Sequence, residues 1–341
     1  GGQNAMIVDS TALTEQVVGD VLASAFDSAG QRCSALRVLY VQEDVAERTI
    51  HMLIGAMDEL AVGDPSQLAT DIGPVIDAEA QGQLLAHIER MKANAEWHHQ
   101  AKLPDAAGTF VPPTMLEIGS LAELKREVFG PVLHVLRYPR ERMIDTIGEV
   151  NATGFGLTFG VHSRIDETIE RAVAASSAGN QYVNRNMIGA VVGVQPFGGH
   201  GLSGTGPKAG GPLYVHRLLS RRPGIDAPTG ELAGPVGERN TYSLRPKGTI
   251  LCVAFDAARL QAQVDLVKAA GNRPTTDATD PAIRAALFAG SRGDLEALLA
   301  TMAGRAGPVV PVYVEPYPRE FLFDEVSLSD NTAAAGGHAS L

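Results

Sequence analysis

Three secondary-structure patterns follow one another in residues 4–42, NAMIVDSTALTEQVVGDVLASAFDSAGQRCSALRVLYVQ. The opening NAMIVDS is a short apolar run, which predicts a strand. Residues 11–30 then place apolar side chains at helical spacing and end at Gly30, which predicts a helix and its stop. These apolar positions are Leu13, Val17, Val18, Val21, Leu22, Ala25 and Phe26. Residues 33–42 predict a second strand, so the segment reads as a strand–helix–strand unit of an α/β fold.

The same alternation continues to about residue 220. Amphipathic spacing predicts helices, and apolar runs punctuated by glycine predict strands. The predicted helices are residues 44–60, 77–95 and 164–179, and the predicted strands are residues 128–138, 155–163 and 180–186. Because strands and helices alternate, we predict an α/β domain over residues 1–220 with a largely parallel sheet.

A linker and a second, smaller domain follow. Residues 221–240, RRPGIDAPTGELAGPVGERN, are rich in proline, glycine and charge, which predicts a linker. Residues 241–341 repeat the strand–helix–strand theme, which predicts a Rossmann-like α/β domain. Its first strand, GTILCVAF, is followed by DAARLQ and not by G-x-G-x-x-G, so we find no dinucleotide fingerprint.

Composition limits the class of protein. The chain has 341 residues, and its net charge of −11 argues against a nucleic-acid partner, which would need a basic stripe. No apolar run approaches the roughly 18 residues that span a bilayer, and no secretory signal is found. The two cysteines make no disulfide framework, so we expect a cytoplasmic location. The abrupt first and last residues, GGQNAMIVDS and NTAAAGGHASL, lead us to expect a piece of a longer protein.

Cys33 lies in a short polar loop, where a sulfur can face a ligand. The thiolate is the nucleophilic form of cysteine, so a reactive site must stabilise negative charge there. Arg32 can supply positive potential, and the backbone N–H groups of a tight loop can hold an oxyanion. The alternative is a small buried structural thiol, which composition alone favours.

Two other features invite a chemical interpretation. Cys252 lies in the apolar strand ILCVAF, which predicts a structural thiol. His98 and His99 stand beside Trp97 but lack a cysteine or acidic partner at ligand spacing. We therefore predict surface histidines and no metal site.

Several motifs resemble the aldehyde dehydrogenase superfamily. FDSAGQRCSALRVLYVQ resembles its active-site cysteine segment, REVFGPVLHV its cofactor-side motif, and QPFGG followed by SGTG its late signature. TGFGLTFGVHSRID, GERNTYSLRP and the terminal NTAAAGGHASL resemble the proline utilization A family of bifunctional proline catabolic enzymes. The resemblance implies a three-layer α/β aldehyde dehydrogenase catalytic domain followed by the smaller Rossmann-like domain. It also implies the family's second activity, L-glutamate-γ-semialdehyde dehydrogenase.

The resemblance implies a role for each matching residue near the reaction centre. Cys33 matches the nucleophile, which forms a thiohemiacetal and, after hydride transfer to NAD, a thioester that water converts to glutamate. Its backbone N–H matches part of the oxyanion hole. Glu127 matches the carboxylate that binds the nicotinamide ribose hydroxyls, and Phe129 the aromatic residue beside the nicotinamide.

The substrate side is implied in the same way. Ser34 and the backbone of Gly189 and Ala190 match the anchor for the substrate α-carboxylate, and Phe197 matches the aromatic residue that packs on its carbon chain. A hydroxyl and small residues leave backbone N–H groups open to an anion.

Taken without the resemblance, each of these residues has a simpler interpretation. Glu127 reads as a solvated charge at a helix end, and Phe129 and Phe197 read as core residues. Gly189 reads as a turn glycine, and Ser34 as a local cap.

The resemblance also implies parts that precede Gly1. These are the glutamate that activates the hydrolytic water, the asparagine that completes the oxyanion hole, the NAD-binding domain and an FAD-dependent proline dehydrogenase domain. We therefore expect the chain alone to bind no cofactor and to be inactive. In the longer protein we expect a homo-oligomer, with the tail after Asp330 docked on the first domain or on a neighbouring subunit. The alternatives are a non-catalytic structural or oligomerisation module, a thiol hydrolase, or another aldehyde dehydrogenase.

Overall fold

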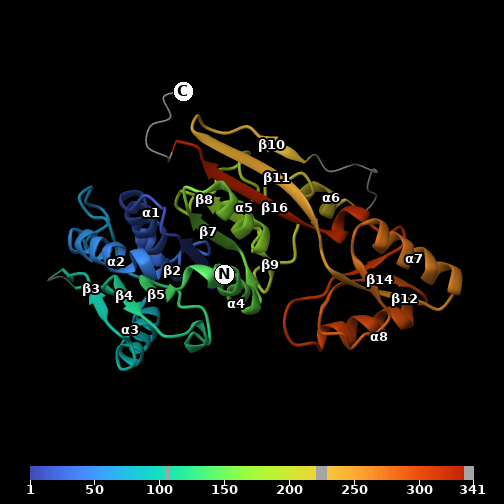
Figure 1. Cartoon of the computed structure of the whole chain (residues 1–341). Coiled ribbons are helices and arrows are strands. Elements are labelled where there is room, and N and C mark those ends of the chain that lie inside the picture. Colours follow the sequence, from blue (N-terminus) through green and yellow to red (C-terminus); the bar gives the residue numbers. More distant parts are fainter. Residues whose placement is uncertain (105–106, 220–228, 334–341) are drawn as a thin grey trace.

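A computed structural model describes residues 1–104, 107–219 and 229–333 (Figure 1). Within these residues the larger sheet has ten strands in the order β10-β11-β16-β8-β7-β1-β2-β5-β4-β3. Its strands are β1 (Ala5–Val8), β2 (Val38–Gln42), β3 (His98–Gln100), β4 (Thr114–Glu117), β5 (Val132–Tyr138), β7 (Thr158–His162), β8 (Asn180–Val183), β10 (Gly230–Leu232), β11 (Glu238–Pro246) and β16 (Phe323–Asn331). From β16 to β4 every neighbouring pair is parallel, which confirms the predicted α/β class.

The helices of this region are α1 (Thr14–Phe26), α2 (Glu43–Asp58), α3 (Ala78–Lys92), α4 (Met143–Ala152), α5 (Asp166–Ala175) and the short α6 (Tyr214–Leu218). Four of them, α1, α2, α3 and α5, lie where the apolar spacing predicts helices, and α4 and α6 are additional to the prediction. Helix α1 packs on α2 and β5, α3 on β4, and α5 on β7. Strands β1 and β2 are buried along their whole length, which explains why they read as continuous apolar runs and not as alternating ones.

Short elements complete the larger sheet region. They are the 3-10 turns η1 (Asp27–Gly30), η2 (Leu121–Glu123) and η3 (Arg140–Arg142), and the pair of two-residue strands β6 (Phe155–Gly156) and β9 (His200–Gly201). Turn η1 lies just before Cys33. Ser28 and Ala29 in it have positive φ angles, a conformation that is unusual for residues with a side chain.

A smaller parallel sheet forms the C-terminal part. Its strand order is β13-β12-β14-β15, with every pair parallel. Its elements are β12 (Thr249–Ala254), α7 (Ala257–Ala269), β13 (Arg273–Thr275), β14 (Ile283–Ala289), α8 (Arg292–Ala303), β15 (Val312–Val314) and the 3-10 turn η4 (Arg319–Leu322). The strand–helix repeats that the sequence predicts are therefore present.

Strands β11 and β16, which flank the smaller sheet in the sequence, belong to the larger sheet. Strands β11 and β16 pair antiparallel over their whole length and extend the larger sheet beyond β8 (Figure 1). The backbone N–H of Ser327 donates to the carbonyl of Gly179 at 2.9 Å, so β16 covers an edge that β8 would otherwise expose. Strand β10 falls inside the predicted linker 221–240, whose residues 221–228 lie outside the described residues. The domain limits at 220 and 240 therefore stay a prediction.

The predicted docking of the tail after Asp330 falls mostly on residues outside the described ones. Strand β16 reaches Asn331, and residues 334–341 lie outside the described residues. In the part of the chain that the structure describes, no helix combines the length and the apolar character that a bilayer crossing requires.

Candidate active site

The site residues gather at one edge of the larger sheet. The turn that holds Cys33 directly precedes β2, Glu127 and Phe129 precede β5, and Thr158 begins β7. Strands β7, β1, β2 and β5 are parallel neighbours in that order, so their amino ends lie along the same edge. Residues that are distant in the sequence are thus brought together by strand order.

Asn4, just before β1, fixes the turn around Cys33. Its side-chain amide donates to the carbonyls of Cys33 at 2.8 Å and Ala35 at 2.9 Å. The Thr158 hydroxyl donates to the carbonyl of Ser34 at 3.1 Å. Among the described residues, the backbone N–H groups of Cys33 and Ser34 have no acceptor. The turn therefore directs its carbonyls inward and leaves two donors for a ligand, as an oxyanion hole requires.

Arg37 holds this turn from the other side. It is 1% exposed, and its guanidinium donates to the carbonyls of Gly30 at 2.7 Å, Gly130 at 3.1 Å and Arg32 at 3.1 Å. Burial lowers its pKa to about 10, against the opposing effect of Glu127, so Arg37 is a cation at neutral pH. One buried cation thus joins the loop before β2 to the loop before β5.

A cleft of about 630 Å³ opens beside the loop before β5. Glu127 and Phe129 form one wall, and Leu84 and His87 on α3 contribute to the other. Phe129 is 45% exposed and lies over Arg37, 5.1 Å from the guanidinium carbon to the ring centre. The Glu127 carboxylate is 3.8 Å from Arg37, and its Oε1 is buried without a hydrogen-bond partner among the described residues. A carboxylate that lacks a hydrogen-bond donor is suited to accept a hydrogen bond from a ligand hydroxyl.

Two buried histidines support the cleft from behind. His134 Nδ1 lies 3.1 Å from the Arg37 carbonyl, so it carries the proton, and His134 Nε2 accepts from His87 Nε2 at 2.9 Å. His87 Nδ1 is then free to accept from Arg90 at 2.7 Å. Burial lowers the pKa of His87 to about 4 and that of His134 to about 3. Both rings are therefore neutral, and every proton in the chain of bonds has an acceptor.

The expected substrate-side residues Gly189 and Ala190 follow a segment that is connected to that of Cys33 indirectly, through Ser24 and Met187. Ser24 accepts from the backbone N–H of Leu36 through its carbonyl and from that of Met187 through its hydroxyl, which ties the segment before Gly189 to the strand after Cys33. Gly189 is exposed and has a φ of +71°. With Ala190 it belongs to a loop in which the described contacts reach no atom of Cys33.

Phe197 is positioned from the amino end of β8. The Asn180 amide donates to the Pro196 carbonyl at 3.0 Å and accepts from the Gly198 N–H at 3.0 Å. Phe197 itself exchanges backbone hydrogen bonds with Ala209 and is half-buried. The structure therefore brings Phe197 to the edge that holds Cys33, without a described contact between the two.

The two cysteines differ in exposure. Cys33 is exposed, whereas Cys252 is buried in β12 with its sulfur 3.9 Å from the carbonyl of Ile250. Burial raises the pKa of Cys252 to about 11. At neutral pH the Cys252 thiol is therefore protonated as well as inaccessible.

This contrast predicts selective alkylation. Brief treatment of the folded protein with iodoacetamide is expected to modify Cys33 and leave Cys252 intact, as measured by mass spectrometry of the peptides. Unfolding in urea before treatment serves as the control and should expose both thiols. Faster modification of Cys252 in the folded protein would contradict the assignment.

The tandem histidines take part in no described metal cluster. His98 is exposed in β3, and His99 Nε2 lies 2.9 Å from the Asp58 carboxylate. Within the described ranges, no three histidine, cysteine or acidic side chains are grouped to hold a metal ion.

Comparisons with known proteins agree with this geometry. A family model described as "Aldehyde dehydrogenase family" matches residues 1–222. The "Bifunctional protein PutA" of Escherichia coli (strain K12) is 44% identical over 100% of the chain and 33% of its own length. The "1-pyrroline-5-carboxylate dehydrogenase" of Geobacillus kaustophilus (strain HTA426) is 38% identical over 63% of the chain and 42% of its own length.

A solved structure extends the similarity to the C-terminal part. Proline utilization A from Corynebacterium freiburgense has a TM-score of 0.77 and 27% identity, over 97% of the chain and 39% of that protein. The chain spans about a third of the length of the curated PutA relatives that it matches. The motif around Cys33, its position at the amino edge of the sheet and the match over residues 1–222 place the chain in the aldehyde dehydrogenase family.

Proposed function

We propose that the chain is the catalytic part of an NAD-dependent L-glutamate-γ-semialdehyde dehydrogenase, which oxidises the aldehyde derived from 1-pyrroline-5-carboxylate to glutamate. The names of the PutA and 1-pyrroline-5-carboxylate dehydrogenase relatives support this substrate. One structural observation carries it: Cys33 is exposed in a turn with two unused N–H donors, and the neighbouring cleft is lined by Glu127, whose Oε1 has no hydrogen-bond donor among the described residues.

The reaction begins when the Cys33 sulfur bonds to the aldehyde carbon and gives a thiohemiacetal. The carbonyl oxygen gains the negative charge, and the N–H of Cys33 stabilises it. When bound, NAD supplies the acceptor for the hydride that leaves this carbon. The thioester that remains on Cys33 is attacked by water, which breaks the carbon–sulfur bond, releases glutamate and restores the thiol.

The cofactor side of the site fits the nicotinamide end of NAD. The Glu127 carboxylate, which accepts no hydrogen bond among the described residues, would accept from the ribose hydroxyls, and the exposed ring of Phe129 would pack beside the nicotinamide. Arg37 holds both side chains through an ion pair and a cation–π contact. Because Glu127 is fixed by a buried partner, its carboxylate is already placed before the cofactor binds.

We further propose that other parts of a longer protein complete the enzyme. The water-activating glutamate, the oxyanion-hole asparagine and the NAD-binding domain would precede Gly1, with an FAD-dependent proline dehydrogenase domain further upstream. The chain alone would then form no NADH, because it would lack the NAD-binding domain as well as the general base. Loss of a positioned general base by itself costs about 10²–10⁴-fold in rate. A coupled NADH assay of the isolated chain and of the longer protein tests this, and NADH formation by the isolated chain would refute it.

Ser34 is proposed to bind the substrate α-carboxylate. Its side chain is 6% exposed, and its hydroxyl has no partner among the described residues, so it is available to a ligand. Gly189 and Ala190 would add backbone donors, and Phe197 would pack on the carbon chain. These contacts select an aldehyde that carries a carboxylate.

The Ser34→Ala variant of the longer enzyme tests this selection. Loss of one hydrogen bond to a charged group costs about 1.5–3 kcal/mol, so KM for glutamate semialdehyde should rise by about 10-fold or more. A short aldehyde without a carboxylate is the control, and its kcat/KM should change little. Equal losses with both aldehydes would mean that Ser34 serves the thiol and not the carboxylate.

A further inference from the structure

A second pocket, of about 260 Å³, lies where β11 and β16 meet the smaller sheet. Its walls come from both parts of the chain. The larger-sheet region contributes Phe155, His200, Arg245 on β11 and Asp324 on β16, and the smaller sheet contributes Arg284 on β14, with Lys247 between β11 and β12. Any molecule in this pocket would contact both parts at once.

The charges on its walls do not balance. Asp324 is the one carboxylate among the described lining residues, and its oxygens contact Lys247 Nζ at 2.5 Å and Arg284 Nη2 at 3.3 Å. Burial by itself would raise the pKa of Asp324, but His200, Lys247 and Arg284 together hold it below its usual value. The ionised Asp324 carboxylate offsets one of the three Lys and Arg cations on the walls, which are Arg245, Lys247 and Arg284. About two positive charges are therefore left uncompensated.

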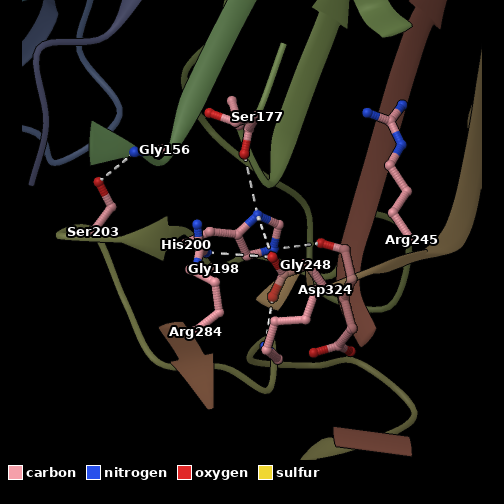
Figure 2. A network of polar contacts seen from close by, with 12 residues as sticks. Gly156, Ser177, Gly198, His200, Ser203, Arg245, Gly248, Arg284 and Asp324 are labelled. Atoms are coloured by element: carbon pink, nitrogen blue, oxygen red, sulfur yellow. Dashed lines mark hydrogen bonds and ion pairs between the residues drawn. The ribbon is translucent and has the colours of Figure 1, made fainter. Parts of the chain in front are cut away.

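Arg245 contributes most to this excess. It stands opposite Asp324 in the β11–β16 register, yet its guanidinium points away from that carboxylate (Figure 2). Its described hydrogen bonds are long ones, to the carbonyls of Val173 at 3.4 Å and Ser176 at 3.3 Å, at the C-terminal end of α5. No carboxylate among the described residues is within ion-pair distance of it. Its Nε and Nη2 donors are therefore left for a ligand.

The remaining cations also keep unused donors. Arg284 is about one-third exposed and uses Nη2 alone, and the Lys247 ammonium has one described partner. His200 adds none, because Nδ1 faces the Ser177 carbonyl at 3.2 Å and Nε2 faces the Glu325 carbonyl at 3.0 Å. Figure 2 shows His200, Arg284 and Asp324 clustered together, with Arg245 apart from them. The pocket thus has two separated sets of cationic donors.

We propose that this pocket binds a short-chain dicarboxylate. One carboxylate pairs with the Arg245 guanidinium and the other with Arg284 and Lys247, since guanidinium groups bind carboxylates through paired hydrogen bonds. Phe155 and the neighbouring Pro308 and Val326 supply an apolar wall for the carbon chain. The volume admits a molecule of this size and is small for a dinucleotide. Because the walls come from both sheets, the ligand joins the two parts of the chain.

Calorimetric titration of the purified protein with succinate tests the site, at an ionic strength held constant with sodium chloride. We expect saturable binding near one succinate per chain and a rise in melting temperature. Arg284→Gln and Arg245→Gln should each weaken binding about tenfold or more. Arg284 is partly exposed, so its variant keeps the fold even if loss of the α5 contacts impairs Arg245→Gln. Arg292→Gln, an exposed cation on α8, is the matched control and should bind as the native protein does.

Three results would overturn the proposal. The first is a succinate titration that gives no saturable heat beyond that of a sodium chloride titration. The second is an equal affinity for succinate in the native protein and in the Arg284→Gln variant. The third is binding that Ser34→Ala abolishes and Arg284→Gln preserves, which would place succinate at the carboxylate anchor beside Cys33. A parallel titration with inorganic phosphate identifies the ligand class. Tighter binding of phosphate than of succinate, lost in Arg284→Gln, would replace the dicarboxylate by a single compact oxyanion.

Discussion

Replacing Cys33 by serine is expected to lower kcat/KM for aldehyde oxidation by about 10⁴-fold or more in a full-length enzyme that carries this chain. A serine hydroxyl is a far weaker nucleophile than a thiolate at neutral pH. The Asn4 and Thr158 contacts go to backbone carbonyls, so they persist in the variant and the fold is preserved.

The matched control is Cys252→Ser, the other cysteine of the chain. Its sulfur is buried in β12, away from the amino edge that holds the site, so activity per folded molecule should stay near the native value. NADH formation measured on both purified variants separates the roles. Activity of Cys33→Ser within tenfold of the native enzyme would exclude Cys33 as the nucleophile.

Replacing Arg37 by methionine is expected to lower the free energy of unfolding by about 3–5 kcal/mol. The change leaves the carbonyls of Gly30, Arg32 and Gly130 without their buried donor, and Glu127 without its cation. Arg37→Lys should recover only part of the loss, because an ammonium cannot reach three carbonyls in the geometry of a planar guanidinium.

Urea unfolding followed by circular dichroism measures this loss. Arg259→Met is the control, since Arg259 is exposed and its ion pair with Glu315 is 3.9 Å long, so the expected change is below about 1 kcal/mol. If Arg37→Met and Arg259→Met unfold at the same urea concentration, Arg37 does not hold the two loops together.

Local pattern predicts much of this fold because buried parallel strands have a strong sequence signature. The apolar runs of β1 and β2, with the amphipathic α1 between them, specify a strand–helix–strand unit without any knowledge of the rest of the chain. The smaller sheet follows from the same signals in β12, α7 and β14. Strand order then brings the motifs of Cys33 and Glu127 to one edge.

Sequence pattern misses the contacts that hold the site. Asn4 reads as a residue at a strand end, and Arg37 as a lone charge at the start of an apolar strand. Their partners lie on other segments, such as Gly130, and no local period encodes that pairing. A charged residue next to a continuous apolar run was the available signal for Arg37, since such a side chain needs buried acceptors.

The sequence also leaves the sheet membership of β11 and β16 open. Their sequences alternate polar and apolar residues only in part, as in TYSL and VSLS, so neither is predicted as a strand, and alternation would not specify a partner. Residues 241–341 therefore read as one Rossmann-like domain. In the structure β11 and β16 pair with each other and extend the larger sheet through β8. The pocket lined by Arg245, Lys247 and Arg284 forms where they meet the smaller sheet.

The most direct test is to trap the covalent intermediate. The full-length enzyme is mixed with NAD and glutamate semialdehyde, quenched in acid within the first turnover, and digested for mass spectrometry. We predict a glutamyl thioester on the peptide that contains Cys33, and none on the peptide that contains Cys252. NADH formation with an unmodified Cys33 peptide, or with the acyl group on another residue, would contradict the proposed mechanism.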